Sequence, residues 1–193
     1  MKLALTLAAV LSLVTFSASA NMLTNGGFET GDASSWNNVS GWTAAGTSAK
    51  DGSFGAVSAG DIGSDELLMQ SATLVAGQEY SLKGFYRIDV AKSAATEGWR
   101  NFLLGFFDHP TWGSPQNQAV MTLSGAAVTD WTAFEVKYTP TEAQVGMGLG
   151  VGAKQGKMDC VVSVDSLSLT AVPEPATMSV LALGALSLIR RRR

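Results

Sequence analysis

The sequence predicts a single all-β domain, a β-sandwich or jelly roll, between two terminal segments of different composition. Short segments of alternating apolar and polar residues recur between Gly, Asn and Asp clusters, as in sandwich proteins. No long helical period occurs between the two ends. The body, residues 21–172 of the 193, is long enough to bury one core without disulfides.

The N-terminal segment has the three parts of a secretory signal. A lysine follows Met1, an apolar run extends over residues 3–16, and the small residues Ala18-Ser19-Ala20 have the A-x-A form of a cleavage site. We therefore expect a cleavable signal helix over residues 1–20, removed after Ala20. A buried amphipathic helix is not favoured, because no polar face interrupts the run.

The clearest strand of the body lies within residues 79–90. Tyr80, Leu82, Tyr86, Ile88 and Val90 fall on one face of it, and the other face carries polar residues that include Arg87 and Asp89. Six further segments have the composition of short strands: 54–58, 67–75, 102–107, 119–123, 132–138 and 161–170.

A glycine-rich segment over residues 145–151 predicts another strand. Apolar residues alternate there with Gly146, Gly148 and Gly150, which leaves one face bare. A bare face admits close approach of another group to the backbone. An overlying loop or a bend at the sheet edge is the favoured explanation, and a bound ligand is the alternative.

The C-terminal segment joins a Pro-Glu-Pro tripeptide to an apolar run and four arginines. The run over 176–189 would be about 21 Å long as a helix, short of a bilayer core of about 30 Å. Arginines hold a chain end on the cytoplasmic side, and the prolines prevent the helix from extending back into the body. This geometry suits a transient membrane stop during export; a plain tail anchor is the alternative.

The order of Pro173, Glu174, Pro175, apolar helix and arginine cluster resembles the PEP-CTERM sorting signal of Gram-negative bacteria. The resemblance implies that an exosortase recognises the tripeptide and removes the tail. It further implies export to the cell surface or extracellular matrix, often in cells that produce exopolysaccharide. The expected organisation is therefore a signal peptide (1–20), one β-sandwich (21–172) and a sorting signal (173–193).

Charge and composition exclude several functions. Five of the 13 basic residues and one of the 16 acidic residues lie in the terminal segments, which leaves eight basic and 15 acidic residues and a body charge of −7. Such a surface disfavours nucleic acid and anionic lipid as partners. The single cysteine excludes an internal disulfide, and the single histidine, His109, has no nucleophile motif beside it. We expect a protein that is not an enzyme.

Five segments of the body together resemble the jelly-roll carbohydrate-binding modules and their galactose-binding-like relatives. They are LTNGGFE at 23–29, Trp36 with Trp42, QSATLVAGQEY at 70–80, the segment beginning at Trp131, and VDSLSL at 164–169. The resemblance implies association with exopolysaccharide or envelope glycans, with the three tryptophans used in packing. A structural or adhesive protein without glycan specificity is the first alternative, and a glycan-processing enzyme is the second.

Sugar binding requires an aromatic plate beside polar groups that can make paired hydrogen bonds. The segment 96–118 is the richest source of both, and Trp99, Arg100 and Trp112 are its principal candidates. Arg87, on the polar face of the preceding strand, could adjoin this segment.

The same resemblance implies a structural calcium ion at Glu29 and Asp165. Asp165 also alternates in step with Leu167 and Leu169, which predicts that it lies on the same apolar face of the last strand. An ionised carboxylate on an apolar face requires a partner. Oxygen atoms near Asn25 and Asp51 could complete the Ca²⁺ ligands. The alternative is a carboxylate that accepts hydrogen bonds from backbone N–H groups.

Overall fold

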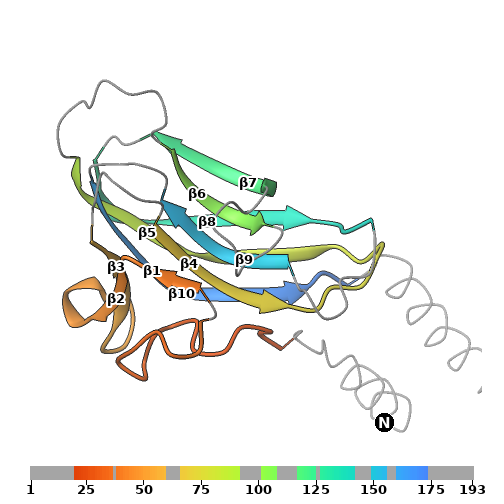
Figure 1. Cartoon of the computed structure of the whole chain (residues 1–193), viewed down its shortest axis with the longest axis horizontal. Helices are drawn as coiled ribbons and strands as arrows, with labels where there is room; N and C mark the ends of the chain where they lie inside the picture. Colours follow the sequence, from red (N-terminus) through yellow and green to blue (C-terminus); the bar gives the residue numbers. More distant parts are fainter. Residues whose placement is uncertain are drawn as a thin grey trace, which may run out of the picture.

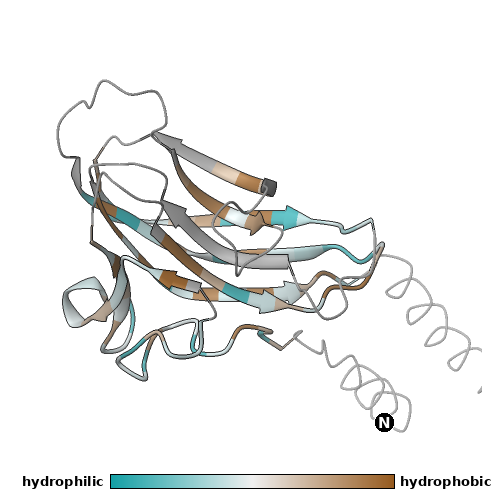
Figure 2. Ribbon diagram, in the orientation of Figure 1, coloured by the Kyte–Doolittle hydropathy of each residue, from teal (hydrophilic) through white to brown (hydrophobic). Residues whose placement is uncertain are grey.

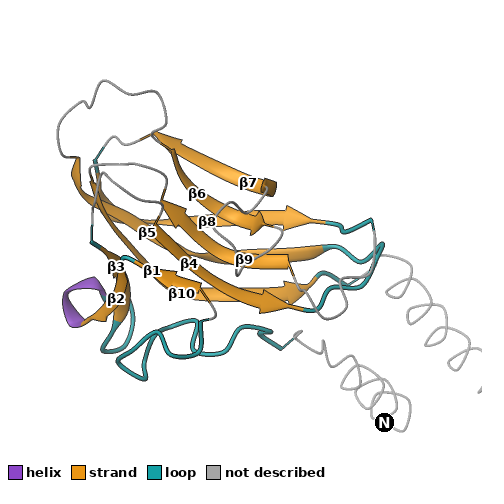
Figure 3. Ribbon diagram, in the orientation of Figure 1, coloured by secondary structure: helices purple, strands orange, loops and turns teal. Residues whose placement is uncertain are grey.

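The computed structural model describes residues 20–36, 38–59, 66–91, 101–107, 117–124, 127–141, 149–155 and 160–173. These form an antiparallel β-sandwich with one short 3-10 turn, η1 (Gly46–Ser48), which confirms the predicted fold class (Figure 3). The two expected terminal helices lie outside the described residues, apart from Ala20 at the end of the first. None of the described segments forms a helix with the length and hydropathy of a membrane span.

Two five-stranded sheets form the layers of the sandwich (Figure 1). Sheet A has the strand order β1 (Asn38–Ser40), β4 (Glu66–Ala72), β9 (Leu149–Gln155), β6 (Asn101–Phe107) and β7 (Asn117–Ser124). Sheet B has the order β2 (Trp42–Ala45), β3 (Gly55–Ser58), β10 (Cys160–Ala171), β5 (Tyr80–Ala91) and β8 (Val128–Tyr138).

The core lies between the sheets and follows the predicted alternation. On β5, Tyr80, Leu82, Tyr86 and Ile88 are buried, which confirms the face assigned to them. The ring of Tyr86 lies 6.2 Å from that of Phe102 on β6, so this pair joins the two layers. Figure 2 shows the corresponding hydrophobic positions along the strands.

All six short strand segments predicted from composition coincide with observed strands, while β1 and β2 were not predicted. These two contain three and four residues, too few to show an alternating pattern. Gly41 separates them, and its φ of 73° suits glycine. At Gly41 the chain therefore passes from sheet A to sheet B.

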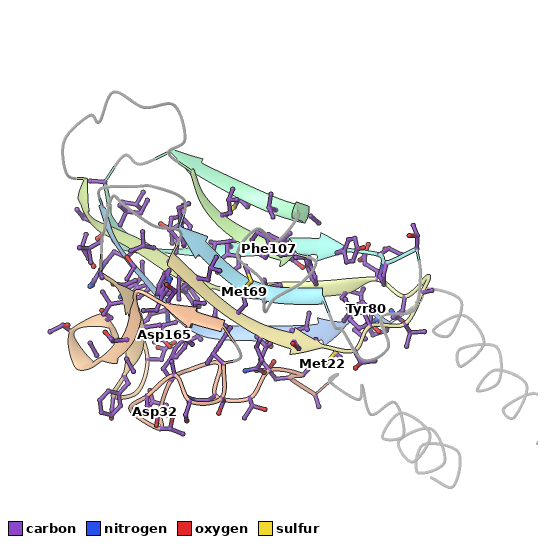
Figure 4. All side chains as sticks on the ribbon, in the orientation of Figure 1. Met22, Asp32, Met69, Tyr80, Phe107 and Asp165 are labelled. Atoms are coloured by element: carbon purple, nitrogen blue, oxygen red, sulfur yellow. The ribbon has the colours of Figure 1, made fainter. Side chains whose placement is uncertain are left out.

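The glycine-rich strand is observed as β9, whereas residues 142–148 lie outside the described residues. Gly152 pairs with Met69 on one side and with Gly105 on the other, on the outer face of sheet A. Met69 and Phe107 on this face are fully buried (Figure 4). The described part of this face therefore presents no exposed aromatic platform.

A β-bulge in β10 corrects the expected orientation of Asp165. The pairing between β10 and β5 shifts between Asp165 and Ser168, and Ser166 has a φ of 54°. Before the bulge, Asp165 pairs with Phe85 on the outer face of sheet B. After it, Leu167 and Leu169 face the core. The parity argument was wrong because a bulge shifts the alternation by one residue.

Candidate functional site

The buried carboxylate of Asp165 holds the loop between β2 and β3. Its Oδ2 atom accepts hydrogen bonds from the backbone N–H groups of Lys50, at 2.7 Å, and Asp51, at 3.1 Å. Its Oδ1 atom accepts one from the N–H of Ser166. Burial raises the pKa of Asp165, while these three N–H groups act in the opposite direction.

Glu29 binds the same loop further along the chain. Its carboxylate accepts hydrogen bonds from the N–H of Ser53, at 3.0 Å, and of Phe54, at 3.2 Å. Gly27 adjoins both acids, since a Cβ built on it would lie 3.8 Å from Cγ of Glu29 and 3.9 Å from Oδ1 of Asp165. We call Glu29, Asp165 and the loop they hold, residues 46–54, the carboxylate clamp.

The two other expected calcium ligands are placed differently. Asp51 lies in the carboxylate clamp, where its side chain pairs with Lys50 at 2.7 Å and accepts a hydrogen bond from Ser166 at 3.1 Å. The hydrogen bond from Lys50 is the main cause that lowers the pKa of Asp51. The side-chain amide of Asn25 instead donates to Thr30 at 2.7 Å.

The residues of the carboxylate clamp fit a cation only in part. Glu29 and Asp165 both lie beside Gly27. Their carboxylate oxygens, however, accept hydrogen bonds from backbone N–H groups. This is the alternative to a calcium site that the sequence left open. In the described ranges, no group of three or more His, Cys, Asp and Glu side chains is placed to hold a metal ion.

A second polar group surrounds Arg87 on the outer face of sheet B. The Arg87 guanidinium lies 5.0 Å from the ring centroid of Trp131 and donates to the carbonyl of Thr47 at 3.1 Å. It also pairs with Asp89 on the same strand. Asp89 in turn accepts a 2.8 Å hydrogen bond from Ser163. We call these five residues the Arg87 cluster.

The structure separates the three tryptophans expected to pack. Trp36 and Trp42 are buried in the core, which confirms the expectation for them. Trp131 is half-buried and lies on the outer face, against Arg87. Trp131 shares the parity of Glu135 and Lys137 within β8, so the alternation of that segment already indicated an outward position.

The remaining sugar-binding candidates, Trp99, Arg100 and Trp112, lie outside the described residues, as does His109. Strand β6, expected at 102–107, divides the segment 96–118 into two connections. The chain enters β6 at Asn101, two residues after Trp99, and leaves it at Phe107, five residues before Trp112. The connections that carry the two tryptophans therefore start from opposite ends of one strand.

Several residues of these two groups were missed by sequence reasoning. Lys50 and Ser53 act through backbone N–H groups, which leave no side-chain signature. Ser163 joins the Arg87 cluster because it pairs with Arg87 across β10 and β5. That register depends on the whole sheet, so no local signal could have revealed it.

A family model describes residues 171–193 as a PEP-CTERM protein-sorting motif. This match confirms the resemblance drawn from Pro173, Glu174 and Pro175. The motif implies exosortase-dependent export and sorting of the protein to the cell surface. Pro173 is exposed, whereas Glu174 and Pro175 lie outside the described residues.

The sandwich has the fold of jelly-roll carbohydrate-binding modules. One similar structure is a Family 16 Carbohydrate Binding Module-2, with a TM-score of 0.56 and 16% identity, covering 78% of this chain and 99% of that one. The CBM22-1 xylan-binding domain from Paenibacillus barcinonensis Xyn10C has a TM-score of 0.56 and 13% identity, covering 81% and 97%.

A cyclase from Fischerella sp. TAU shares the fold too, with a TM-score of 0.53 and 17% identity, covering 81% of this chain and 98% of that one. The fold is thus found in both binding modules and an enzyme, and it does not by itself decide between them. No curated protein matches this sequence.

Proposed function

We propose that this protein is a non-catalytic, glycan-associating component of the surface or extracellular matrix of a Gram-negative bacterium. In this proposal an exosortase processes the tail, and the sandwich then associates with exopolysaccharide or envelope glycans. The sorting motif and the fold shared with carbohydrate-binding modules support it. Individually weak glycan contacts would gain strength from many copies on one surface.

The observation that carries the proposal is the Arg87 cluster. It combines a half-buried aromatic ring, a guanidinium and a carboxylate on one outer face. These are the groups that a sugar-binding site requires, because an aromatic ring covers the apolar face of a pyranose and charged groups bind its hydroxyls. Trp99, Arg100 and Trp112 remain proposed contributors to glycan binding.

The test is isothermal titration of the chain from Asn21 onward, kept in mild detergent, against soluble polysaccharides with calcium present. We expect saturable binding that Trp131→Ala weakens at least about tenfold, a loss of about 1.4 kcal/mol. Arg87→Ala, Trp99→Ala and Trp112→Ala are measured in parallel to locate the remaining contacts. Lys83→Ala is the matched control, because Lys83 lies on the same strand and face but outside the cluster.

Absence of heat with every glycan, from folded protein, would overturn the proposal in favour of a structural or adhesive matrix protein. Turnover of a polysaccharide would instead favour a glycan-processing enzyme. Binding that is unchanged in Trp131→Ala and Arg87→Ala but lost in Trp99→Ala or Trp112→Ala would move the glycan site away from the Arg87 cluster.

Calcium is a separate part of the proposal. Glu29 and Asp165 would supply carboxylate oxygens to a structural Ca²⁺, and the support for this is that both side chains lie beside Gly27. A ligand that binds the folded state raises the melting temperature. We therefore expect calcium to raise it, and Glu29→Gln to abolish the rise. A melting temperature unchanged by chelator would contradict calcium binding and leave the carboxylates as hydrogen-bond acceptors.

A further inference from the structure

The folded sandwich continues to the residue before the sorting tripeptide. Ala171 pairs with Tyr80 at the end of β10. The next residue, Val172, donates its N–H to the carbonyl of Glu79 at 2.8 Å, and its own carbonyl accepts the side-chain amide of Gln78 at 2.7 Å. Val172 is therefore tied to the turn at residues 75–79, and Pro173 follows without a spacer.

The distance from this point to the apolar run is short. Four residue steps separate Val172 from Ala176, and a fully extended chain spans at most about 14 Å over four steps. The headgroup layer on one side of a bilayer is about 5 to 8 Å thick. While the run lies in the membrane, the sandwich can therefore move only a few ångströms from the bilayer surface.

The end of the sandwich at this point is suited to such contact. We call it the tail pole: the turn at 75–79, Met22 and Val172. Val75 is 61% exposed and Met22 38%, and they are two of the three large apolar side chains that are exposed among the described residues. The N–H of Gly77 donates to the carbonyl of Pro140 at 2.9 Å, so a second loop braces the turn. Figure 4 shows Met22 and Tyr80 at this same end.

Among the described residues, the tail pole carries no unbalanced charge that would oppose membrane contact. Glu79 is paired with Lys137 at 3.3 Å, which leaves the two charges balanced. The exposed residues around the turn, Val75, Ala76 and Gly77, are uncharged. Apolar side chains on such a surface can enter the boundary between headgroups and acyl chains.

We infer that, before its tail is removed, the protein rests on the bilayer through the tail pole, with the lipid headgroup layer as the partner. The inference rests on the proposed function and on the transient membrane insertion of the tail that its sequence leads us to expect. In this arrangement the opposite end of the sandwich, where the loop 46–54 lies, points away from the membrane (Figure 1).

The experiment uses the chain from Asn21 onward, the form expected after leader removal, inserted into phosphatidylcholine vesicles. Cys160, the single cysteine, is replaced by serine, and one new cysteine carries an environment-sensitive fluorophore. The label is placed at Val75→Cys in one sample and at Thr47→Cys, an exposed position on the far loop, in the matched control. Quenching by headgroup nitroxide lipids is then measured for both.

We expect quenching at position 75 to exceed that at position 47 several-fold. A ten-residue Gly-Ser linker inserted after Val172 spans about 17 Å on average and should lower quenching at position 75 towards the control value. Equal quenching at both positions, with the tail resistant to alkaline extraction, would overturn the inference. Extraction of the chain by alkali would overturn membrane insertion of the tail itself. Glycan binding is tested separately, by the titration described above.

Discussion

The backbone N–H of Lys50 donates a 2.7 Å hydrogen bond to the carboxylate of Asp165, which lies 115 residues later in the chain. This bond fastens the loop between β2 and β3 to the bulge of β10. The same loop contributes the carbonyl of Thr47 to Arg87. The carboxylate clamp and the Arg87 cluster therefore share one loop, and a change in one is expected to affect the other.

Asp165→Ala should lower the free energy of unfolding by about 3 kcal/mol. The substitution removes the acceptor of three backbone N–H groups at a buried position, and unpaired buried donors cost about 1 to 3 kcal/mol each. Urea unfolding measures the change. Asp130→Ala, at an exposed aspartate of β8, is the control and should change stability by less than about 0.5 kcal/mol. Equal effects of the two would contradict the role given to Asp165.

Gly52→Ala should destabilise the protein more than Gly77→Ala. Both glycines have positive φ values, 72° and 80°, so each substitution carries a backbone cost of about 1 kcal/mol. A Cβ at Gly52 would also fall within 2.4 Å of a Glu29 carboxylate oxygen, whereas one at Gly77 meets nothing within 4 Å. The difference in unfolding free energy between the two variants therefore measures how rigidly Glu29 is held against the loop. No difference would show that Glu29 moves aside freely.

Arg87→Lys should lower the free energy of unfolding by about 1 kcal/mol, although the charge is kept. A lysine ammonium cannot lie flat on Trp131 while it also reaches the carbonyl of Thr47. Lys83→Ala, which removes an exposed ion pair with Glu135, should cost less than about 0.5 kcal/mol. An Arg87→Lys protein as stable as the original would show that charge alone holds the Arg87 cluster together.

Ser81→Ala should raise the pKa of Glu135 towards its ordinary value. The Ser81 hydroxyl donates to Glu135 at 2.7 Å and is the main cause that lowers this pKa, with a smaller contribution from Lys83. A carboxyl with a folded-state pKa below its unfolded value stabilises the protein at higher pH, and this stability is lost as pH falls through the folded pKa. The variant should therefore lose less stability on acidification.

Carboxyl NMR titration of Glu135 and urea midpoints over roughly pH 3 to 7 measure this effect. Thr170→Ala is the control, because Thr170 lies directly opposite Ser81 on β10. An unchanged Glu135 titration in Ser81→Ala would show that Lys83, rather than the hydroxyl, governs the carboxyl.

The alternation of apolar residues sufficed to predict most strands and the buried face of β5. It failed where the pattern was too short, at β1 and β2, and where a bulge interrupts it, at Asp165. For the candidate site, the sequence indicated Arg87, Glu29 and Asp165. It did not indicate Trp131 as the partner of Arg87, because the parity of β8 contained only the outward position of Trp131.

The sequence by itself determined the all-β class and the sorting motif, because both depend on residues close together in the chain. Only the tertiary structure decided that Asp165 holds the loop at Lys50 and that Ser163 faces Arg87. Those contacts join residues 115 and 76 positions apart in the chain, and their register is set by sheet pairing and by a single bulge. A change of one residue in register would send each side chain to the other face.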